Sequence, residues 1–227
     1  MFERYSKVKC NASFGRFFIS FYDCPRDLSK KVYFYPMARP RSGEKYDAIL
    51  KATLQIGAEA GFHGLSMSKI AKAAGVAPAT IYIYFENIDA IINQLYVDLK
   101  ELVFGGSVDG VKPYMSSRQS FEIIWKNLYH NILTYNVEFR FLEQFTNSPY
   151  ITQISKEEGY RPFSPIIHFL KQTIGKGEIK DMPLDMIMAF FFAPIASLTK
   201  QIIAGHLEMT EDQITEAIQN AWNAIKA

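Results

Sequence analysis

The outer side of a short predicted helix near residue 80 carries side chains suited to contact with a nucleic acid. Tyr82 and Tyr84 each offer a phenol hydroxyl group that can donate a hydrogen bond to a phosphate oxygen. Thr80 adds a third hydroxyl group, while Ala77 and Ala79 are small enough for another molecule to approach the backbone. The alternative for the two tyrosines is burial in the protein core. If the two tyrosines are exposed, their chemistry is binding to a nucleic acid rather than the making of covalent bonds.

Two predicted helices around a glycine turn hold these side chains in place. Ser66 is a good N-cap for the first helix, and Gly75 ends it because glycine tolerates a left-handed backbone. Pro78 fits the first turn of the second helix, where no amide proton is needed. Ile83 then also lies on the outer side of this second helix. Two short helices at a steep angle predict a helix-turn-helix, whose second helix is shaped for a DNA major groove.

Residues with catalytic or metal-binding potential are few and scattered. The four histidines fall on different predicted helices, and His130 and His168 would form a metal pair only through an accident of the tertiary fold. Cys10 and Cys24 give neither a disulfide framework nor zinc spacing. No Ser/His/Asp order and no glycine-rich phosphate loop is present. We therefore expect no enzyme activity, no metal and no cofactor.

Aromatic side chains are concentrated in the second half of the chain. Pockets for apolar ligands are lined in this way, with a few polar groups that fix orientation. The ordinary alternative is a helical core, which is the more frequent fate of any single aromatic residue. The candidates for a ligand pocket are Trp125, Tyr129, Phe145, Tyr160 and Phe163. Glu122, Glu143 and Asp185 are candidates to meet a cation there, with simple solvation at the surface as the alternative.

Helical spacing of apolar residues after residue 44, with almost no alternation of period two, predicts an all-α fold. Three glycines within residues 105–110 mark a linker between two domains. We expect a three-helix DNA-binding domain over residues 38–104 that contains the helix-turn-helix. A larger helical ligand-binding and dimerisation domain follows over residues 111–227.

The predicted helix Leu184–Ala204 is apolar nearly all round, with a kink at Pro194. Such a helix must be covered. Membrane insertion is one alternative, but flanking Asp185 and Lys200 favour a second copy of the chain. Thr210 and Gln213 form a capping signature that starts the last helix. We expect a homodimer through the last two helices, about residues 184–226, no membrane partner, and a cytoplasmic location.

The first 37 residues differ from the remainder in composition. Residues 1–41 contain nine Lys and Arg against three acids, whereas residues 42–101 contain five against seven. The segment before Met37 is either translated from upstream of the natural start or a loose tail, which predicts no fold for residues 1–37. The functional alternative is a basic arm, in which Arg39 and Arg41 add phosphate contacts.

The stretch from residue 49 to residue 92 resembles the DNA-binding domain of the tetracycline-repressor (TetR/AcrR) family of bacterial transcription regulators. The matching residues are Ile49-Leu50, Ala52, Ala58, Gly61-Phe62, Ser66-Met67, Ile70-Ala71, Ala74-Gly75-Val76, Thr80, Ile81-Tyr82, Tyr84-Phe85 and Ile91-Ile92. The resemblance implies a homodimer whose recognition helices enter successive major grooves of a near-palindromic operator. It also implies that a ligand in the helical body releases the DNA.

Specific roles follow from the same resemblance. Ser66 and Thr80 would contact phosphates or base edges, and Tyr82 and Tyr84 would contact the DNA backbone. The surface of closest approach would be Ala77, Pro78 and Ala79, with phosphate charge added by Lys69 and Lys72. The function expected is a ligand-responsive repressor of transcription that a small, mainly apolar or aromatic effector releases from its double-stranded DNA operator. The alternative is a dimeric helical small-molecule-binding protein with weak or lost DNA binding.

Two positions depart from the family pattern. Ile88 stands where a lysine is usual, which removes one phosphate contact and lowers the expected salt dependence of DNA binding. Gly57 stands where a large aromatic residue is usual, in the last turn of the first helix. The missing side chain predicts a gap in the small core of the DNA-binding domain.

Overall fold

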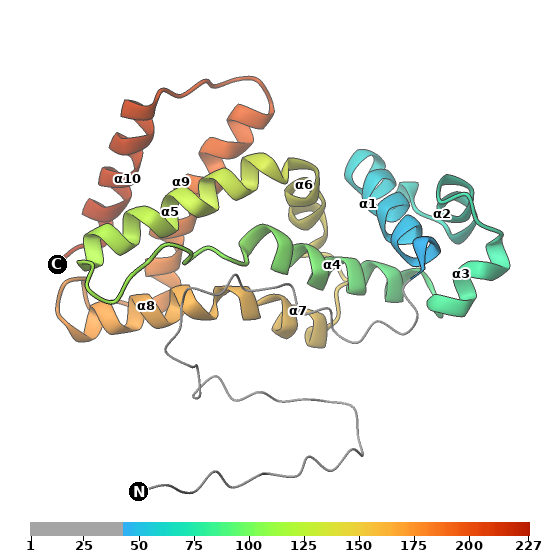
Figure 1. The fold of residues 1–227 in the computed structure, drawn as a ribbon, viewed down its shortest axis with the longest axis horizontal. Coiled ribbons are helices and arrows are strands. Elements are labelled where there is room, and N and C mark those ends of the chain that lie inside the picture. Colours follow the sequence, from blue (N-terminus) through green and yellow to red (C-terminus); the bar gives the residue numbers. More distant parts are fainter. Residues whose placement is uncertain (1–42) are drawn as a thin grey trace, which may run out of the picture. The chain divides into compact units, whose positions relative to one another are not determined.

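The computed structural model describes residues 43–227, and these residues form an all-α fold, as the sequence predicts. Figure 1 shows α1, α2 and α3 at one end, α8, α9 and α10 at the other, and α4 and α5 running between them. The helices are α1 (Glu44–Gly64), α2 (Met67–Ala73), α3 (Pro78–Tyr84), α4 (Ile88–Phe104), α5 (Ser117–Thr134), α6 (Asn136–Phe145), α7 (Gln153–Gly159), the 3-10 helix η1 (Arg161–Phe163), α8 (Ser164–Gly175), α9 (Leu184–Ile203) and α10 (Glu211–Ile225).

The first three helices pack around a small apolar core. Ile49 of α1, Ile70 of α2 and Ile81 of α3 are fully buried there. Regular α1 geometry is interrupted at Gly61, where φ is +62°. A left-handed backbone is readily adopted only by glycine, so Gly61 marks a break inside α1, which ends at Gly64.

Helix α4 runs from the helix-turn-helix into the rest of the fold (Figure 1). The side chain of Asn87 caps it by accepting a hydrogen bond from the Ala90 amide at 2.9 Å. Ile91, Ile92, Leu95 and Leu99 form its buried stripe. One continuous helix therefore contributes to both regions.

Helices α5, α9 and α10 pack together through aromatic rings. The ring of Phe121 on α5 meets Phe191 of α9 at 5.2 Å and Trp222 of α10 at 5.1 Å, both edge to face. Aromatic pairs favour this geometry. The predicted capping box of Thr210 and Gln213 is present at the start of α10. These contacts fix α9 with one face inside and one face outside.

The segment after α6 forms the short helices α7 and η1 before α8 begins at Ser164. Gly159 ends α7 where it passes close to α4, since a Cβ atom at Gly159 would lie 2.7 Å from Cε1 of Tyr96. No other residue type fits this approach without a shift of the Tyr96 ring. The chain continues through η1 and places Phe163 against α4.

The gap predicted at Gly57 is filled from another helix. Phe141 and Phe145 of α6 stack on one another at 4.2 Å, and a Cβ atom at Gly57 would lie 2.6 Å from Cε2 of Phe141. Gln144 of α6 also donates a hydrogen bond to the Ala58 carbonyl at 3.4 Å. Gly57 is therefore a notch that receives the aromatic side chains of α6, rather than a packing defect.

Candidate nucleic-acid interface

The turn between α2 and α3 is held by backbone hydrogen bonds. The Val76 amide donates to the Ala71 carbonyl at 3.0 Å, and the Gly75 amide donates to the Lys72 carbonyl at 3.3 Å. With φ of +66° at Gly75, this is a Schellman motif. Pro78 then occupies the first turn of α3, as predicted. The angle between the two helices is thus set by local backbone chemistry.

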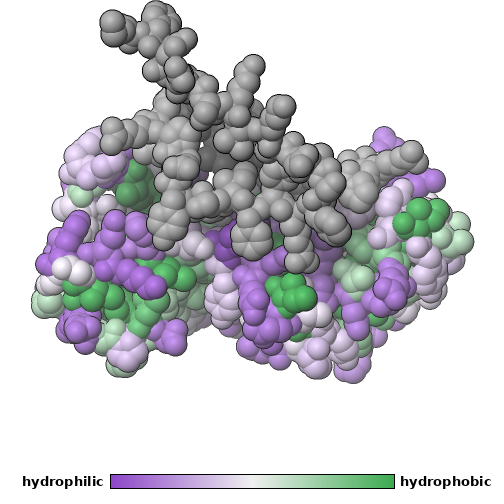
Figure 2. Space-filling model, turned by 90° about the horizontal axis from the view of Figure 1, so that it is seen from below, coloured by the Kyte–Doolittle hydropathy of each residue, from purple (hydrophilic) through white to green (hydrophobic). Residues whose placement is uncertain are grey.

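Helix α3 has one fully buried side chain and a broad exposed face. Ile81 is fully buried, whereas Tyr82 is 58% exposed and Ile83 is 78% exposed. Ala77, Pro78 and Ala79 are also exposed. Figure 2 shows hydrophobic side chains at the surface among hydrophilic ones at the end of the molecule that carries α3 in Figure 1. The sequence analysis placed Ile83 on the outer side of this helix but predicted no role for it. Its position next to Tyr82 was the signal that it belongs to the same exposed face.

The polar candidates on α2 and α3 are only partly available. The Ser66 hydroxyl oxygen accepts a hydrogen bond from the Lys69 amide at 3.2 Å, so it caps α2 as predicted. Ser66 and Thr80 are half-buried, while Lys69 and Lys72 are exposed. A phosphate contact from Ser66 would use the hydroxyl proton, because phosphate oxygens accept hydrogen bonds, and the Ser68 hydroxyl group lies 3.2 Å away as a competing partner.

Tyr84 differs from Tyr82 in its surroundings. Its ring is half-buried and meets Tyr46 of α1 edge to face at 6.0 Å. Tyr46 in turn stacks on the buried Phe85 at 5.2 Å. Tyr84 is thus packed against α1 on one side, whereas Tyr82 extends into solvent.

Positive charge is scarce on this surface. The whole of α3 contains no basic residue, and Glu86 and Asp89 are exposed beside the start of α4. Ile88 is half-buried there and offers no charge. Arg39 and Arg41 lie outside the described residues. Shape and backbone groups must therefore contribute much of any DNA contact made by α3.

Two family models match consecutive parts of the chain. Residues 49–95 match "Bacterial regulatory proteins, tetR family", and residues 117–226 match "Tetracyclin repressor-like, C-terminal domain". A TetR-family regulator structure from Marinobacter aquaeolei VT8 superposes with a TM-score of 0.74 and 30% identity, over 81% of this chain and 96% of that one. The chain belongs to the TetR family. It is a transcription regulator with a helix-turn-helix DNA-binding domain, and members of this family bind DNA operators and usually act as dimers.

Two curated relatives of this TetR-family chain differ in how much they share with it. An uncharacterised helix-turn-helix regulator from Haemophilus influenzae is 23% identical over 79% of this chain and 95% of its own length. A fatty acid metabolism regulator protein from Bacillus subtilis is 48% identical, but over 23% of this chain and 27% of its own length. The second match covers 52 residues, a minor part of both chains.

The five aromatic residues predicted to line a ligand pocket fall into three groups in this TetR-family regulator. Trp125 and Tyr129 stack at 5.7 Å on α5, and Phe145 belongs to the rings that face α1. Tyr160 and Phe163 lie at 6.4 Å near η1, where Tyr160 is 65% exposed. No ring pair among the described residues joins one group to another. The buried indole N–H of Trp125 has no hydrogen-bond partner, so that group retains a free donor.

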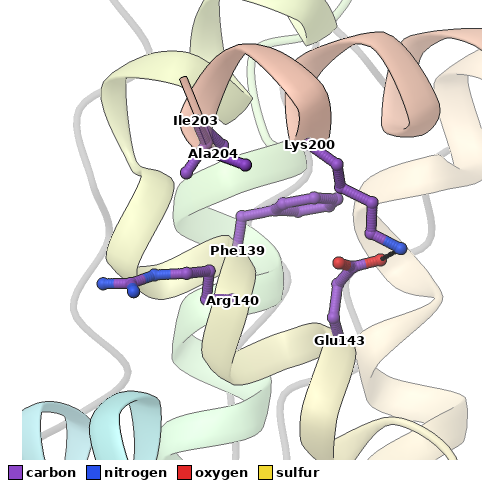
Figure 3. A pocket seen from close by; sticks show the side chains of 6 residues that line it. All are labelled: Phe139, Arg140, Glu143, Lys200, Ile203 and Ala204. Atoms are coloured by element: carbon purple, nitrogen blue, oxygen red, sulfur yellow. Dashed lines mark ion pairs between the residues drawn. The ribbon is translucent and has the colours of Figure 1, made fainter. Parts of the chain in front are cut away.

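A shallow cleft of about 280 Å³ lies between α6 and the end of α9 (Figure 3). Its lining residues are Phe139, Arg140, Glu143, Lys200, Ile203 and Ala204. Sequence reasoning did not single out this cleft, although it proposed that Glu143 meets a cation. Glu143 pairs with Lys200 at 2.6 Å, and Glu122 pairs with Lys126 at 2.9 Å. Over residues 43–227, no cluster of three or more His, Cys, Asp or Glu side chains could hold a metal ion.

Proposed function

We propose that this protein is a ligand-responsive repressor that binds a near-palindromic operator as a homodimer. The observation that carries the proposal is the arrangement of α3. Ile81 anchors the helix in the core, and the opposite face presents Tyr82 and Ile83 beside the small residues 77–79. An isoleucine side chain can pack on a thymine methyl group, and a phenol can donate to a phosphate oxygen. Residues 38–104 would be the DNA-binding domain and residues 111–227 the body.

The face of α9 that the fold leaves open supports the homodimer. Helix α9 is long and apolar enough to cross a membrane by length and composition, and 22% of its most apolar window is buried. Met186 and Phe190 are exposed on it, while the outer face of α10 is polar. Lys200 is tied to α6 by its ion pair with Glu143, which favours a protein environment over lipid. We therefore place the centre of the dimer face on α9, with α10 at its side.

Two connections would carry a signal from the body to α3. Helix α4 runs continuously from Ile88 to Phe104, and α6 holds α1 through the Gly57 notch. An effector that shifts either helix in one protomer changes the separation of the two α3 helices in the dimer. An operator of fixed half-site spacing would then be bound less tightly. The proposed effector is small and mainly apolar or aromatic, as the rings of the body suggest.

A second function is favoured by the weak positive charge of the candidate interface. With no basic residue on α3 and Ile88 at the start of α4, the protein would be a dimeric helical small-molecule-binding protein with weak or lost DNA affinity. The two functions differ in whether the body acts on DNA or on another target. A direct DNA-binding experiment separates them.

The test is a gel-shift titration of the full chain against the DNA upstream of its own gene. The repressor proposal expects a sequence-selective complex with a Kd of about 10 nM or below, weakened by added salt. Sedimentation of the protein alone would give the mass of two chains. If the protein binds the upstream DNA no more tightly than it binds scrambled DNA of the same length, the repressor proposal is overturned and the second function is supported.

A further inference from the structure

Lys100, near the end of α4, lies among aromatic rings. Its ammonium group is 5.4 Å from the ring centroid of Tyr96, 5.1 Å from that of Phe104 and 5.5 Å from that of Phe163. Its Cγ atom lies close to Gly159, where a Cβ atom would be 3.2 Å away. Two segments, α4 and the α7–η1 region, thus enclose one lysine side chain.

This lysine has no carboxylate partner within the part of the chain that the structure describes. The acids that form ion pairs there, Glu122 and Glu143, bind other cations. Burial without a counter-charge lowers the pKa of the Lys100 ammonium from 10.5 to about 8. Faces of aromatic rings attract a cation, but they replace only part of the hydration that a lysine loses. Lys100 therefore carries a charge that no described acid balances through an ion pair.

An apolar region adjoins the ammonium group. The rings of Phe104 and Phe163 lie 4.7 Å apart, and Phe192 of α9 meets them at 5.7 Å and 6.3 Å. Tyr160 lies next to Phe163 and is largely exposed. The site therefore combines a single cation, a cluster of three phenylalanines and an exposed tyrosine at its edge.

We propose that Lys100 and the phenylalanine cluster form a binding site for an amphiphilic organic anion. The ammonium group pairs with its carboxylate, and Phe104, Phe163 and Phe192 pack on its apolar chain or ring. The inference rests on the proposed function in one respect, because this anion would be the effector of the regulator. It goes beyond that function by naming the chemical class of the ligand and the residue that selects it.

The position of the site also gives a route by which such a ligand would affect the DNA-binding region. Lys100 is on α4, whose first turn directly follows α3. Phe163 is on η1 and Phe192 is on α9, so one ligand would contact three segments of the body. Drawing these segments together or apart would move α4 relative to α9, the helix at the proposed dimer face.

The first experiment measures binding by isothermal titration calorimetry on the full chain at pH 7. The probes are decanoate, 2-naphthoate, decan-1-ol and decyltrimethylammonium, which separate the head group from the apolar part. At least one carboxylate is expected to bind, and the alcohol and the quaternary amine are expected to bind at least about tenfold more weakly. If neither carboxylate binds, or if alcohol and carboxylate bind equally, the proposal is overturned.

Variants then test the residue. Lys100→Met is expected to lose at least about tenfold in carboxylate affinity with no change for the alcohol, since one partner of a desolvated charge pair is removed. Lys100→Arg keeps the cation and should retain most of the affinity. Lys126→Met is the matched control, because that lysine is paired with Glu122 at the surface. Equal carboxylate binding by wild type and Lys100→Met would contradict the assignment even where every variant folds.

The DNA readout distinguishes this proposal from the function on which it rests. If decanoate binds through Lys100 but leaves the operator complex unchanged, the site stands and the ligand-responsive repressor fails. If another class of compound releases the DNA while Lys100→Met responds as the wild type does, the repressor stands and this site is not its effector site. If the carboxylate releases DNA from the wild-type protein but not from Lys100→Met, both the repressor and the Lys100 site are supported.

Discussion

The two ends of α4 differ in the charged side chains that they carry. At its start, beside the candidate DNA interface, Ile88 is half-buried between the exposed acids Glu86 and Asp89, and no lysine is present. Near its end, Lys100 is enclosed by three aromatic rings and has no ion-pair partner among residues 43–227. The end expected to meet a polyanion has little positive charge, while the other end carries a lysine with no ion-pair partner among the described residues.

This contrast suggests how each region works. Binding at α3 would depend on the shape of the groove and on side chains such as Tyr82, since electrostatic attraction is weak there. The Lys100 region would sacrifice stability for a ligand, which is common at functional sites. The four predictions below sharpen or break this comparison, from the largest expected effect to the smallest.

Lys100→Met should stabilise the ligand-free protein at pH 7. Because the pKa of Lys100 falls from 10.5 to about 8, the folded protein binds fewer protons than the unfolded chain between these values. The penalty is fully present below pH 8 and disappears as the pH rises towards 10.5, so removing the charge is worth up to about 3 kcal/mol at pH 7. Urea unfolding at several pH values would measure this.

The same experiment has an internal control. The free energy of unfolding of wild type should rise between pH 8 and 10.5 relative to that of Lys100→Met, whereas Lys126→Met should follow wild type, because that surface pair is worth little. If Lys100→Met is less stable than wild type at pH 7, the lysine contributes to the fold, and the contrast between the two ends of α4 is lost.

The Gly57 notch packs α6 of the body against α1, beside the helix-turn-helix. Alanine in a helix interior is ordinarily more stable than glycine by about 1 kcal/mol. At Gly57 the added Cβ atom would lie 2.6 Å from the Phe141 ring, so Gly57→Ala should instead destabilise the protein by about 1–3 kcal/mol. Thermal unfolding would show the difference.

Gly175→Ala is the matched control for that variant. Gly175 ends α8, and nothing lies within 4 Å of an added Cβ atom there, so this change should be neutral or slightly stabilising. If Gly57→Ala is as stable as Gly175→Ala, α6 does not pack tightly against α1 at Gly57. The route from the body to α3 would then run through α4 alone.

Sequence reasoning succeeded where structure is set by neighbours along the chain. The cap at Ser66, the left-handed Gly75 and the capping box at Thr210 follow from contacts within three or four residues, and all are present. It failed at Gly57, where the predicted gap is filled by Phe141, because periodicity does not show which distant helix packs at a given position. Lys100 was missed for the same reason, since its rings come partly from η1.

Candidate sites divide in a similar way. The exposed face of α3 could be listed from helical spacing, because one buried position, Ile81, fixes the rest of so short a helix. The body residues could not be grouped in advance, and Phe145 lies with the rings that face α1, apart from Tyr160 and Phe163. Their roles in DNA and ligand binding stay predictions.

Tyr82→Ala tests the DNA side of the comparison. Because this side chain is exposed and has no described packing partner to lose, the variant should keep the helicity and dimer mass of wild type. Loss of its contact in both protomers should weaken operator binding by about 2 kcal/mol, or about thirtyfold. Tyr114→Ala, which removes an exposed tyrosine in the loop before α5, is the control and should bind as wild type does. A dissociated Tyr82→Ala dimer would assign Tyr82 a structural role instead.

Ile88→Lys should produce the smallest change, and it acts directly on the contrast between the ends of α4. A lysine at this half-buried position, beside the first turn of the helix, would restore the phosphate contact that is usual in the family. Each protomer of the dimer adds one contact, so the slope of log K against log salt concentration becomes steeper by about 1.8. Gel-shift titrations at several salt concentrations would measure it, with Ile88→Met as the uncharged control. If the slope does not change, the start of α4 does not face a phosphate, and the scarcity of charge there has no bearing on DNA binding.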